Sequence, residues 1–200
     1  FVHDEDMGTD FDDAESHIQD TAKFKVRSGF ETIDHMLGGG WDIQTLNVVM
    51  AETNNGKSLW MQNFAARSAD MGYNVLYITL EMSERKVLKR IGSMRLKIPI
   101  NDYDRISKDT ESIKRKIQSL KSSSNGIGDD IFEKKVGKIM TKFWAAGTAT
   151  VNEFDSYITK LREKKGIKID LVIVDYITLI APQKGMSTDN LYSKGKSLAE

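Results

Sequence analysis

The sequence predicts an α/β fold in which a mainly parallel sheet is flanked by helices. Three observations support this prediction. Short apolar runs typical of buried strands alternate with longer segments of helical periodicity. A glycine-lysine-serine sequence stands between one such run and the next helical segment. The most apolar run of the chain, residues 171–174, is followed directly by an aspartate. Strands that alternate with helices are typical of a parallel sheet covered on both faces.

The first part of the chain differs in composition from the rest. Residues 1–22 contain 8 acidic residues and no lysine or arginine. We expect them to form an acidic linker or tail, and two interpretations stay open. The segment is either solvated and partly disordered, or it docks on a neighbouring subunit. Residues 23–200 are expected to form one domain.

Within that domain, order is expected to begin near Phe24. The spacing of apolar residues predicts a helix over 30–37, which the glycines at 38–40 end. A buried strand is expected over 45–50, followed by a helix over about 58–71.

A second strand is expected over 74–79, and Ser83 is the candidate N-cap of the helix that follows. We expect a helical insert at about 101–135, with flexible composition near its middle. The remaining expected elements are a strand over 138–144, a helix near 152–165 and a strand over 171–176.

The bulk composition excludes several classes of protein. The chain has no cysteine, which excludes disulfides and thiolate metal sites and favours a reducing compartment. Its 29 basic residues balance 29 acidic ones, so net charge gives no sign of nucleic-acid binding. No apolar run approaches the roughly 20 residues that cross a bilayer. We expect a cytoplasmic protein of a bacterial or phage-infected cell, with no membrane partner.

The segment before the predicted helix at 58–71 has the spacing of a phosphate-binding loop. Asn54-Asn55-Gly56-Lys57-Ser58 is the second half of the Walker A pattern. Gly56 lets the backbone amides curl around an anion, and the following helix directs its N-terminus at the same phosphates. Lys57 supplies charge to the phosphates, and the Ser58 hydroxyl is a hard ligand for Mg²⁺.

This pattern makes seven residues candidates for binding ATP: Thr53, Asn54, Asn55, Gly56, Lys57, Ser58 and Leu59. One position departs from it, because Ala51 stands where the pattern has its first glycine. The alternative is a turn that opens a helix and has these residues by chance.

Two acidic residues follow predicted strands. Asp175 comes after four apolar residues, in the place of a Walker B aspartate that holds Mg²⁺. Its alternative role is to cap the strand. Glu81 follows the strand after the phosphate-loop helix, where a carboxylate can orient or deprotonate the attacking water. Its alternative role is to complement the dipole of the next helix.

Four segments together resemble the DnaB-like replicative helicases, and especially the branch from T-even-like phages. They are Leu46 to Ala51, Asn55 to Leu59, Asn74 to Met82, and Ile173 to Tyr176. An alanine at the first Walker A position is also found in that branch. The resemblance implies a RecA-like ATPase domain over residues 23–200.

The same resemblance implies roles and partners. Lys57 and Ser58 would bind nucleotide and Mg²⁺, Glu81 would be the catalytic base, and Asp175 would be the acid on the Mg²⁺ side. Lys57 would also act in catalysis. The protein would form a homo-hexamer around single-stranded DNA, with a primase and a helicase loader as partners. The loop after the Walker B strand tends to face the channel in RecA-like folds, which makes Lys184 a candidate DNA contact. The alternative is an ordinary loop exposed to solvent.

The resemblance also predicts an incomplete domain. The chain ends at Glu200 within a predicted helix, whereas relatives continue well beyond that point. The arginine finger would lie outside, and such a residue is worth roughly 10³ to 10⁵ in rate. We therefore expect this chain to bind Mg-ATP but to hydrolyse it slowly. Two alternatives remain: a RecA- or KaiC-like ATPase that unwinds nothing, and a nucleotide-binding fragment inactive on its own.

Overall fold

The computed structural model describes residues 24–52, 54–122 and 136–182. The predicted acidic segment at 1–22 lies outside this part of the chain, as does the end of the predicted insert. The domain boundaries therefore stay predictions. In the described residues no helix has the length and apolarity needed to cross a membrane.

The described elements follow one another as the sequence predicts for an α/β chain. In order they are β1 (Lys25–Val26), α1 (Glu31–Met36), β2 (Trp41–Asp42), α2 (Lys57–Asp70), β3 (Val75–Thr79), α3 (Glu84–Leu96), α4 (Ile100–Ile106), α5 (Thr110–Ser122), β4 (Ile139–Phe143), α6 (Val151–Lys165), β5 (Leu171–Asp175) and the short 3₁₀ helix η1 (Ile177–Leu179).

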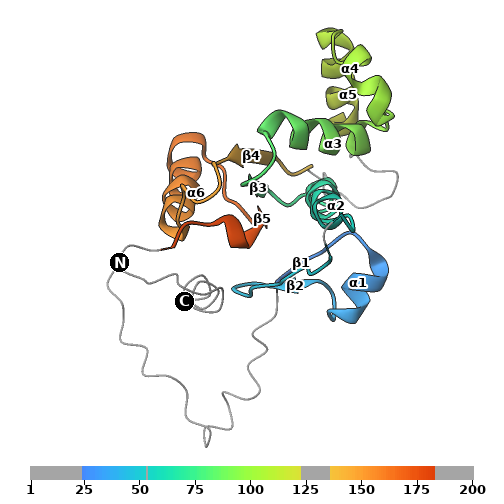
Figure 1. The fold of residues 1–200 in the computed structure, drawn as a ribbon. Coiled ribbons are helices and arrows are strands. Elements are labelled where there is room, and N and C mark those ends of the chain that lie inside the picture. Colours follow the sequence, from blue (N-terminus) through green and yellow to red (C-terminus); the bar gives the residue numbers. More distant parts are fainter. Residues whose placement is uncertain (1–23, 53, 123–135, 183–200) are drawn as a thin grey trace, which may run out of the picture.

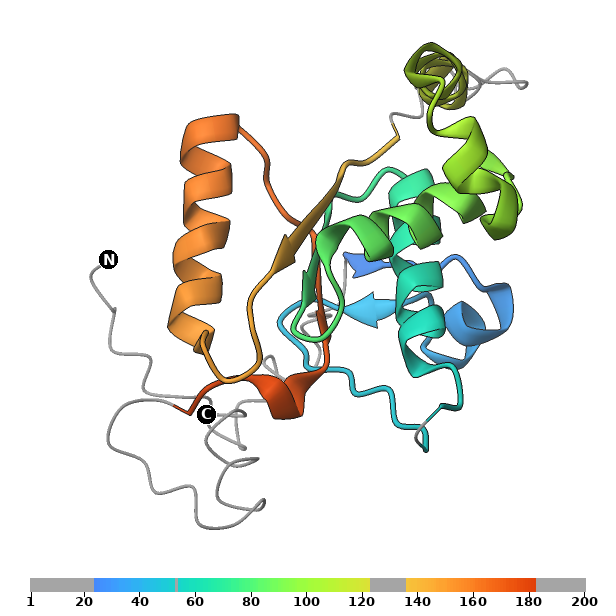
Figure 2. The ribbon, with the colours of Figure 1, turned by 45° about the horizontal axis from the view of Figure 1, so that its top comes forward.

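A parallel sheet of three strands, in the order β4-β3-β5, lies at the centre of the molecule. Helix α6 covers one face of this sheet, while α2 and α3 cover the other (Figures 1 and 2). Every residue of β3 is buried, because this strand has a neighbour on each side and helices on both faces. Side chains alternate along β3, so Tyr77 packs with the α2 and α3 core and Ile78 with the α6 core.

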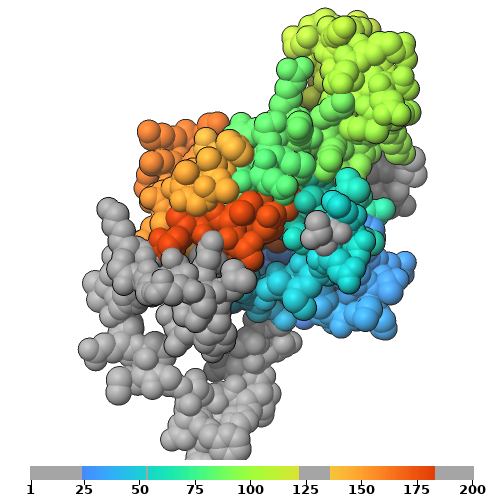
Figure 3. Space-filling model, viewed as in Figure 1, coloured from blue at the N-terminus to red at the C-terminus, as the bar shows by residue number. Residues whose placement is uncertain are grey.

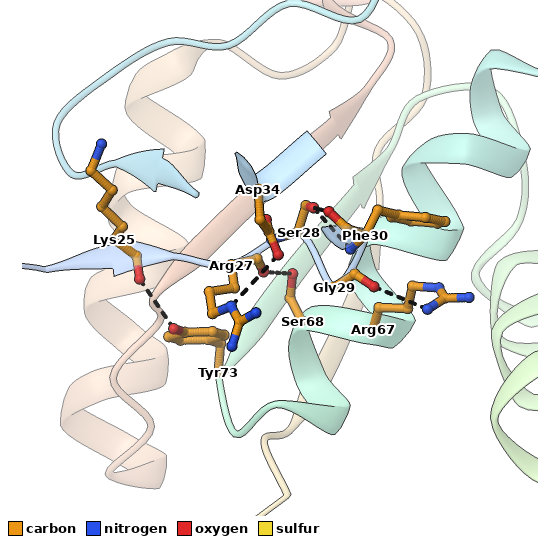
Figure 4. A network of polar contacts seen from close by, with 9 residues as sticks. All are labelled: Lys25, Arg27, Ser28, Gly29, Phe30, Asp34, Arg67, Ser68 and Tyr73. Carbon is orange, nitrogen blue, oxygen red and sulfur yellow. Dashed lines mark hydrogen bonds and ion pairs between the residues drawn. The ribbon is translucent and has the colours of Figure 1, made fainter. Parts of the chain in front are cut away.

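The segment around β1 and α1 is held against α2 by a network of polar contacts (Figure 4). Three side chains of α2 and the turn after it donate to main-chain carbonyl oxygens at 2.9 to 3.1 Å. The donors are Arg67, Ser68 and Tyr73, and the acceptors belong to Gly29, Arg27 and Lys25 respectively. Because the acceptors are alternate residues of one segment, these contacts fix its position along α2.

Helices α4 and α5 pack beyond α3, away from the sheet (Figure 1). Gly92 of α3 permits this packing, because a β-carbon there would overlap the Tyr103 hydroxyl of α4. The helical character predicted for this region is confirmed over α4 and α5. The strands predicted over 74–79, 138–144 and 171–176 and the helices at 58–71 and 152–165 are also present.

The prediction of a buried strand over 45–50 is wrong. No strand is formed there, and Leu46, Val48 and Met50 are 67%, 61% and 87% exposed. An apolar run forms a strand only where another strand pairs with it. In the described residues β3 is the one strand paired with β5, so the other edge of β5 is open and the 45–50 segment runs past it unpaired. Figure 3 shows the segment that leads into α2 beside the residues after β5.

Candidate functional site

The N-terminus of α2 forms the first part of the site. The helix begins at Lys57 and its N-cap is Gly56, whose φ of 77° is left-handed. Asn54 has a φ of 66°, so the chain turns sharply twice before the helix. In the described residues no side chain caps this helix end. Its first N–H groups therefore remain available to an anion, which the helix dipole favours.

Asp175 at the end of β5 forms the second part of the site. Its backbone is paired with Thr79 of β3, and the residue is only 2% exposed. The Ser58 hydroxyl donates to Asp175 Oδ1 at 3.1 Å, and the Tyr77 hydroxyl donates to Oδ2 at 2.7 Å. Two residues separated by 117 positions in the sequence, one in each motif, are thus in direct contact.

The Tyr77 hydroxyl has a raised pKa, so it loses its proton less readily than an ordinary tyrosine does. Burial, followed by the negative charge and the hydrogen bond of Asp175, raises the pKa of Tyr77 far above its usual range. Gln62 and Arg90 oppose this shift in part. Gln62 lies beside the hydroxyl, yet its buried amide makes no hydrogen bond of standard geometry. The Tyr77 hydroxyl is accordingly a permanent donor near neutral pH.

Lys57 is the first residue of α2 and directly precedes Ser58. Its Nζ is 4.4 Å from the centroid of the Tyr176 ring, a cation–π contact. Tyr176 directly follows Asp175, so the residue after the buried aspartate lies against the Lys57 ammonium. The lysine stem is flexible, and its ammonium can move from the ring to a phosphate.

Glu81 stands on a tight turn after β3. The Thr79 hydroxyl donates to the Met82 carbonyl oxygen at 2.8 Å and accepts from the Met82 N–H at 3.1 Å. This closed turn presents Glu81 to solvent at the sheet edge where Asp175 also lies. The structure thus places both predicted acids at the carboxyl ends of adjacent strands, where ligands bind in open α/β sheets.

The oxygen atoms at the site fit Mg²⁺. A hydroxyl and a carboxylate oxygen only 3.1 Å apart are hard ligands of the type that Mg²⁺ prefers. In the part of the chain that the structure describes, no three His, Cys, Asp or Glu residues are grouped to hold a metal by themselves.

Two predicted site residues, Thr53 and Lys184, lie outside the described residues. Conversely, sequence reasoning did not identify Tyr77 and Tyr176. A signal for Tyr77 existed: a tyrosine within an otherwise aliphatic buried strand needs a partner for its hydroxyl. For Tyr176 the one available signal in the sequence was its position directly after Asp175.

With this geometry, comparison with known proteins identifies the family. A sequence model described as the DnaB-like helicase C terminal domain matches residues 25–197. The chain belongs to this family. A DnaB-like replicative helicase of Enterobacteria phage T4 is 30% identical over 177 residues, which make up 88% of this chain and 35% of that relative. The chain thus spans about a third of the length of the relative.

Membership in the DnaB-like family confirms the predicted resemblance and the RecA-like fold, with which the parallel sheet and its flanking helices agree. The family consists of helicase motors, and it implies in general a nucleotide and Mg²⁺. These are the ligands for which the helix N-terminus and the oxygen pair are suited.

Proposed function

We propose that this chain is the ATP-binding motor domain of a hexameric replicative DNA helicase, which couples ATP hydrolysis to movement along single-stranded DNA and to duplex unwinding. The observation that carries the proposal is the contact between Ser58 and Asp175. It joins the two halves of a nucleotide site beside an uncapped helix N-terminus. The DnaB-like family supports the choice of a helicase over other uses of such a site.

In this proposal each side chain has a distinct task. The amides at the start of α2 and the Lys57 ammonium bind the phosphates, and Lys57 leaves the Tyr176 ring to do so. Ser58 and Asp175 hold Mg²⁺, which when bound neutralises charge on the β- and γ-phosphates. Glu81 accepts a proton from the attacking water or orients it.

The proposal extends to the partners of the family. Single-stranded DNA would occupy the centre of a ring of six subunits, with ATP bound between neighbours. A primase and a helicase loader would act with the ring. These statements rest on the relation to the DnaB-like family and to the replicative helicase of phage T4.

Calorimetric titration with Mg-ATP tests nucleotide binding, on which the rest of the proposal depends. We expect binding by the unaltered chain and a loss of at least about tenfold in affinity for Lys57→Ala, since a charge-assisted contact to phosphate is removed. Lys160→Ala is the matched control, because this exposed lysine lies on α6 on the opposite face of the sheet. It should bind like the unaltered protein.

Failure of the unaltered chain to bind Mg-ATP would overturn the nucleotide-binding function. If binding is present, turnover with and without single-stranded DNA tests the DNA part. Stimulation by DNA and displacement of a strand from a forked duplex would support a helicase. ATP hydrolysis that DNA never changes would favour a RecA-like ATPase that does not unwind.

A further inference from the structure

Tyr77 makes a contact that the proposed nucleotide chemistry does not by itself require. It lies in the middle of the central strand and is 0% exposed. Its hydroxyl is 2.7 Å from Oδ2 of Asp175, which is itself 2% exposed. A buried phenol is therefore paired with a buried carboxylate within the sheet core, and this carboxylate is the proposed metal ligand.

The register of the sheet explains this contact. Tyr77 is aligned with Ile173 on β5, two residues before Asp175. Residues two apart on a strand share a face, so Ile173 and Asp175 both point to the α2 side, where Tyr77 also packs. A phenol is long enough to reach diagonally along that face to Asp175, whereas an aliphatic side chain would end near Ile173.

The pairing makes the two carboxylate oxygens unequal. Oδ2 accepts from Tyr77 and faces the core, whereas Oδ1 accepts from Ser58 and faces the nucleotide site. A carboxylate without the phenol could rotate and leave either oxygen, or neither, near Ser58. With Oδ2 held by the Tyr77 hydroxyl at 2.7 Å, Oδ1 is the oxygen left beside the Ser58 hydroxyl.

We propose that Tyr77 is a positioning residue that holds the Asp175 carboxylate with Oδ1 beside Ser58 and thereby sets the Mg²⁺ affinity of the nucleotide site. This inference rests on the proposed function. Tyr77 touches neither metal nor nucleotide and acts through Asp175 alone. Removal of the Tyr77 hydroxyl should weaken Mg²⁺ binding. It should leave phosphate binding by Lys57 and by the amides at the start of α2 unchanged.

The test is a Mg²⁺ titration of ADP binding, carried out on the 200-residue chain. Tyr77→Phe keeps the ring and removes only the hydroxyl. We expect the Mg²⁺ concentration that gives half of the maximal gain in ADP affinity to rise about tenfold. This factor corresponds to the loss of one hydrogen bond to a charged group. ADP affinity without Mg²⁺ should change less than about twofold, because the amides and Lys57 that bind phosphate are untouched.

Tyr157→Phe is the control for loss of a phenol hydroxyl from a partly buried tyrosine elsewhere in the fold. Tyr157 belongs to α6 and packs on the opposite face of the sheet, so its variant should keep the Mg²⁺ midpoint of the unaltered chain. Tyr77→Met fills similar space and also lacks the hydroxyl. Tyr77→Met should shift the Mg²⁺ midpoint as Tyr77→Phe does. Circular dichroism shows which of the two variants folds, and the midpoint of a folded variant tests the role of Tyr77.

A background of Asp175→Asn shows whether Tyr77 acts through Asp175. Tyr77→Phe should there change the Mg²⁺ dependence by less than about twofold, since the two residues form one unit. An undiminished effect in that background would overturn the inference, as would an unchanged midpoint in the single variant. If the unaltered chain binds no ADP at all, the proposed function falls, and the role of Tyr77 falls with it.

Discussion

Gly137 lies where the chain returns to the sheet before β4, against the turn that joins α2 to β3. Its N–H donates to the Ala69 carbonyl oxygen at 2.8 Å. A β-carbon at this position would overlap the main-chain carbonyl of Tyr73. Backbone atoms of the turn cannot move aside as the end of a flexible side chain can, so the close approach requires glycine.

Gly137→Ala should therefore destabilise the protein by about 1–3 kcal/mol, the usual cost of overpacking a tight site. Urea denaturation followed by circular dichroism measures this change. The expected sign is a lower midpoint with little change in the slope.

Gly166→Ala provides the comparison. Gly166 ends α6 with a φ of 62°, but a β-carbon there would meet no atom within 4 Å. Its cost is only the left-handed backbone, about 1–2 kcal/mol. If Gly137→Ala left the stability unchanged while Gly166→Ala lowered it, the prediction that a β-carbon at position 137 overlaps the Tyr73 carbonyl would be wrong.

The sequence could predict which residues of the two motifs come together, but not how. Phosphate-loop spacing and the aspartate after an apolar run place Ser58 and Asp175 at one sheet edge, and they lie 3.1 Å apart. Their roles in nucleotide binding remain predictions. The contacts of Tyr77 and Tyr176 depend on strand register and side-chain direction, which periodicity does not specify.

Among the structural elements, the turn after β3 links a buried strand to the exposed Glu81. The single hydroxyl of Thr79 closes this turn through two contacts with the main chain of Met82. Because Thr79 itself is fully buried, the turn is anchored in the core while Glu81 faces solvent. Such an anchor limits the positions available to the carboxylate.

Thr79→Val keeps the shape of the side chain and removes both hydrogen bonds. We expect a loss of stability of about 1–3 kcal/mol, because partly buried main-chain groups of Met82 lose their partner. In the proposed function, ATP turnover should fall more than Mg-ATP affinity, since Glu81 is displaced while α2 is untouched. Turnover assays and calorimetry on the same preparation separate the two quantities.

Thr148→Val is the matched control for this turn. The Thr148 hydroxyl donates to the Ala145 carbonyl oxygen at 2.7 Å in another turn, between β4 and α6. This variant should leave the ratio of turnover to affinity unchanged. An equal fall in turnover for both variants would argue against a specific role for the turn that carries Glu81.

At the same scale, strands were predictable where the fold gives them a partner in the sheet. The run at 74–79 became β3 and the run at 171–176 became β5, because both pair within the sheet. The run at 45–50 has similar composition and no partner among the described residues. The two-residue strands β1 and β2 gave no periodic signal, since their pairing joins Lys25 to Asp42 across a helix and a glycine turn.

Across the whole molecule, three tyrosines lie in different environments, and only Tyr77 among them is fully buried. Tyr77 lies in the layer under α2, Tyr103 packs between α4 and α3, and Tyr157 lies on α6. Burial is the first cause that raises the pKa of all three, and for Tyr77 the neighbouring Asp175 adds to it. The folded chain thus retains protons at alkaline pH that the unfolded chain loses.

This difference predicts how stability depends on pH. A raised folded pKa contributes stability that is complete below the unfolded value, about 10 for tyrosine, and is lost as pH rises above it. Since the pKa of Tyr77 lies far above that value, its contribution should fall by up to about 1.4 kcal/mol per pH unit throughout the alkaline range above pH 10. Urea denaturation at a series of pH values between about 10 and 11.5 measures the slope.

Tyr77→Phe should flatten this alkaline slope by nearly the full amount, because phenylalanine cannot ionise in either state. Lysine titration contributes to both proteins and cancels in their difference. Tyr157→Phe should flatten the slope less, because Tyr157 is only partly buried and lies far from Asp175 on the opposite face of the sheet. Parallel slopes for the unaltered chain and Tyr77→Phe would mean that Tyr77 ionises as readily in the folded protein as in the unfolded one. That result would contradict its burial against the Asp175 carboxylate.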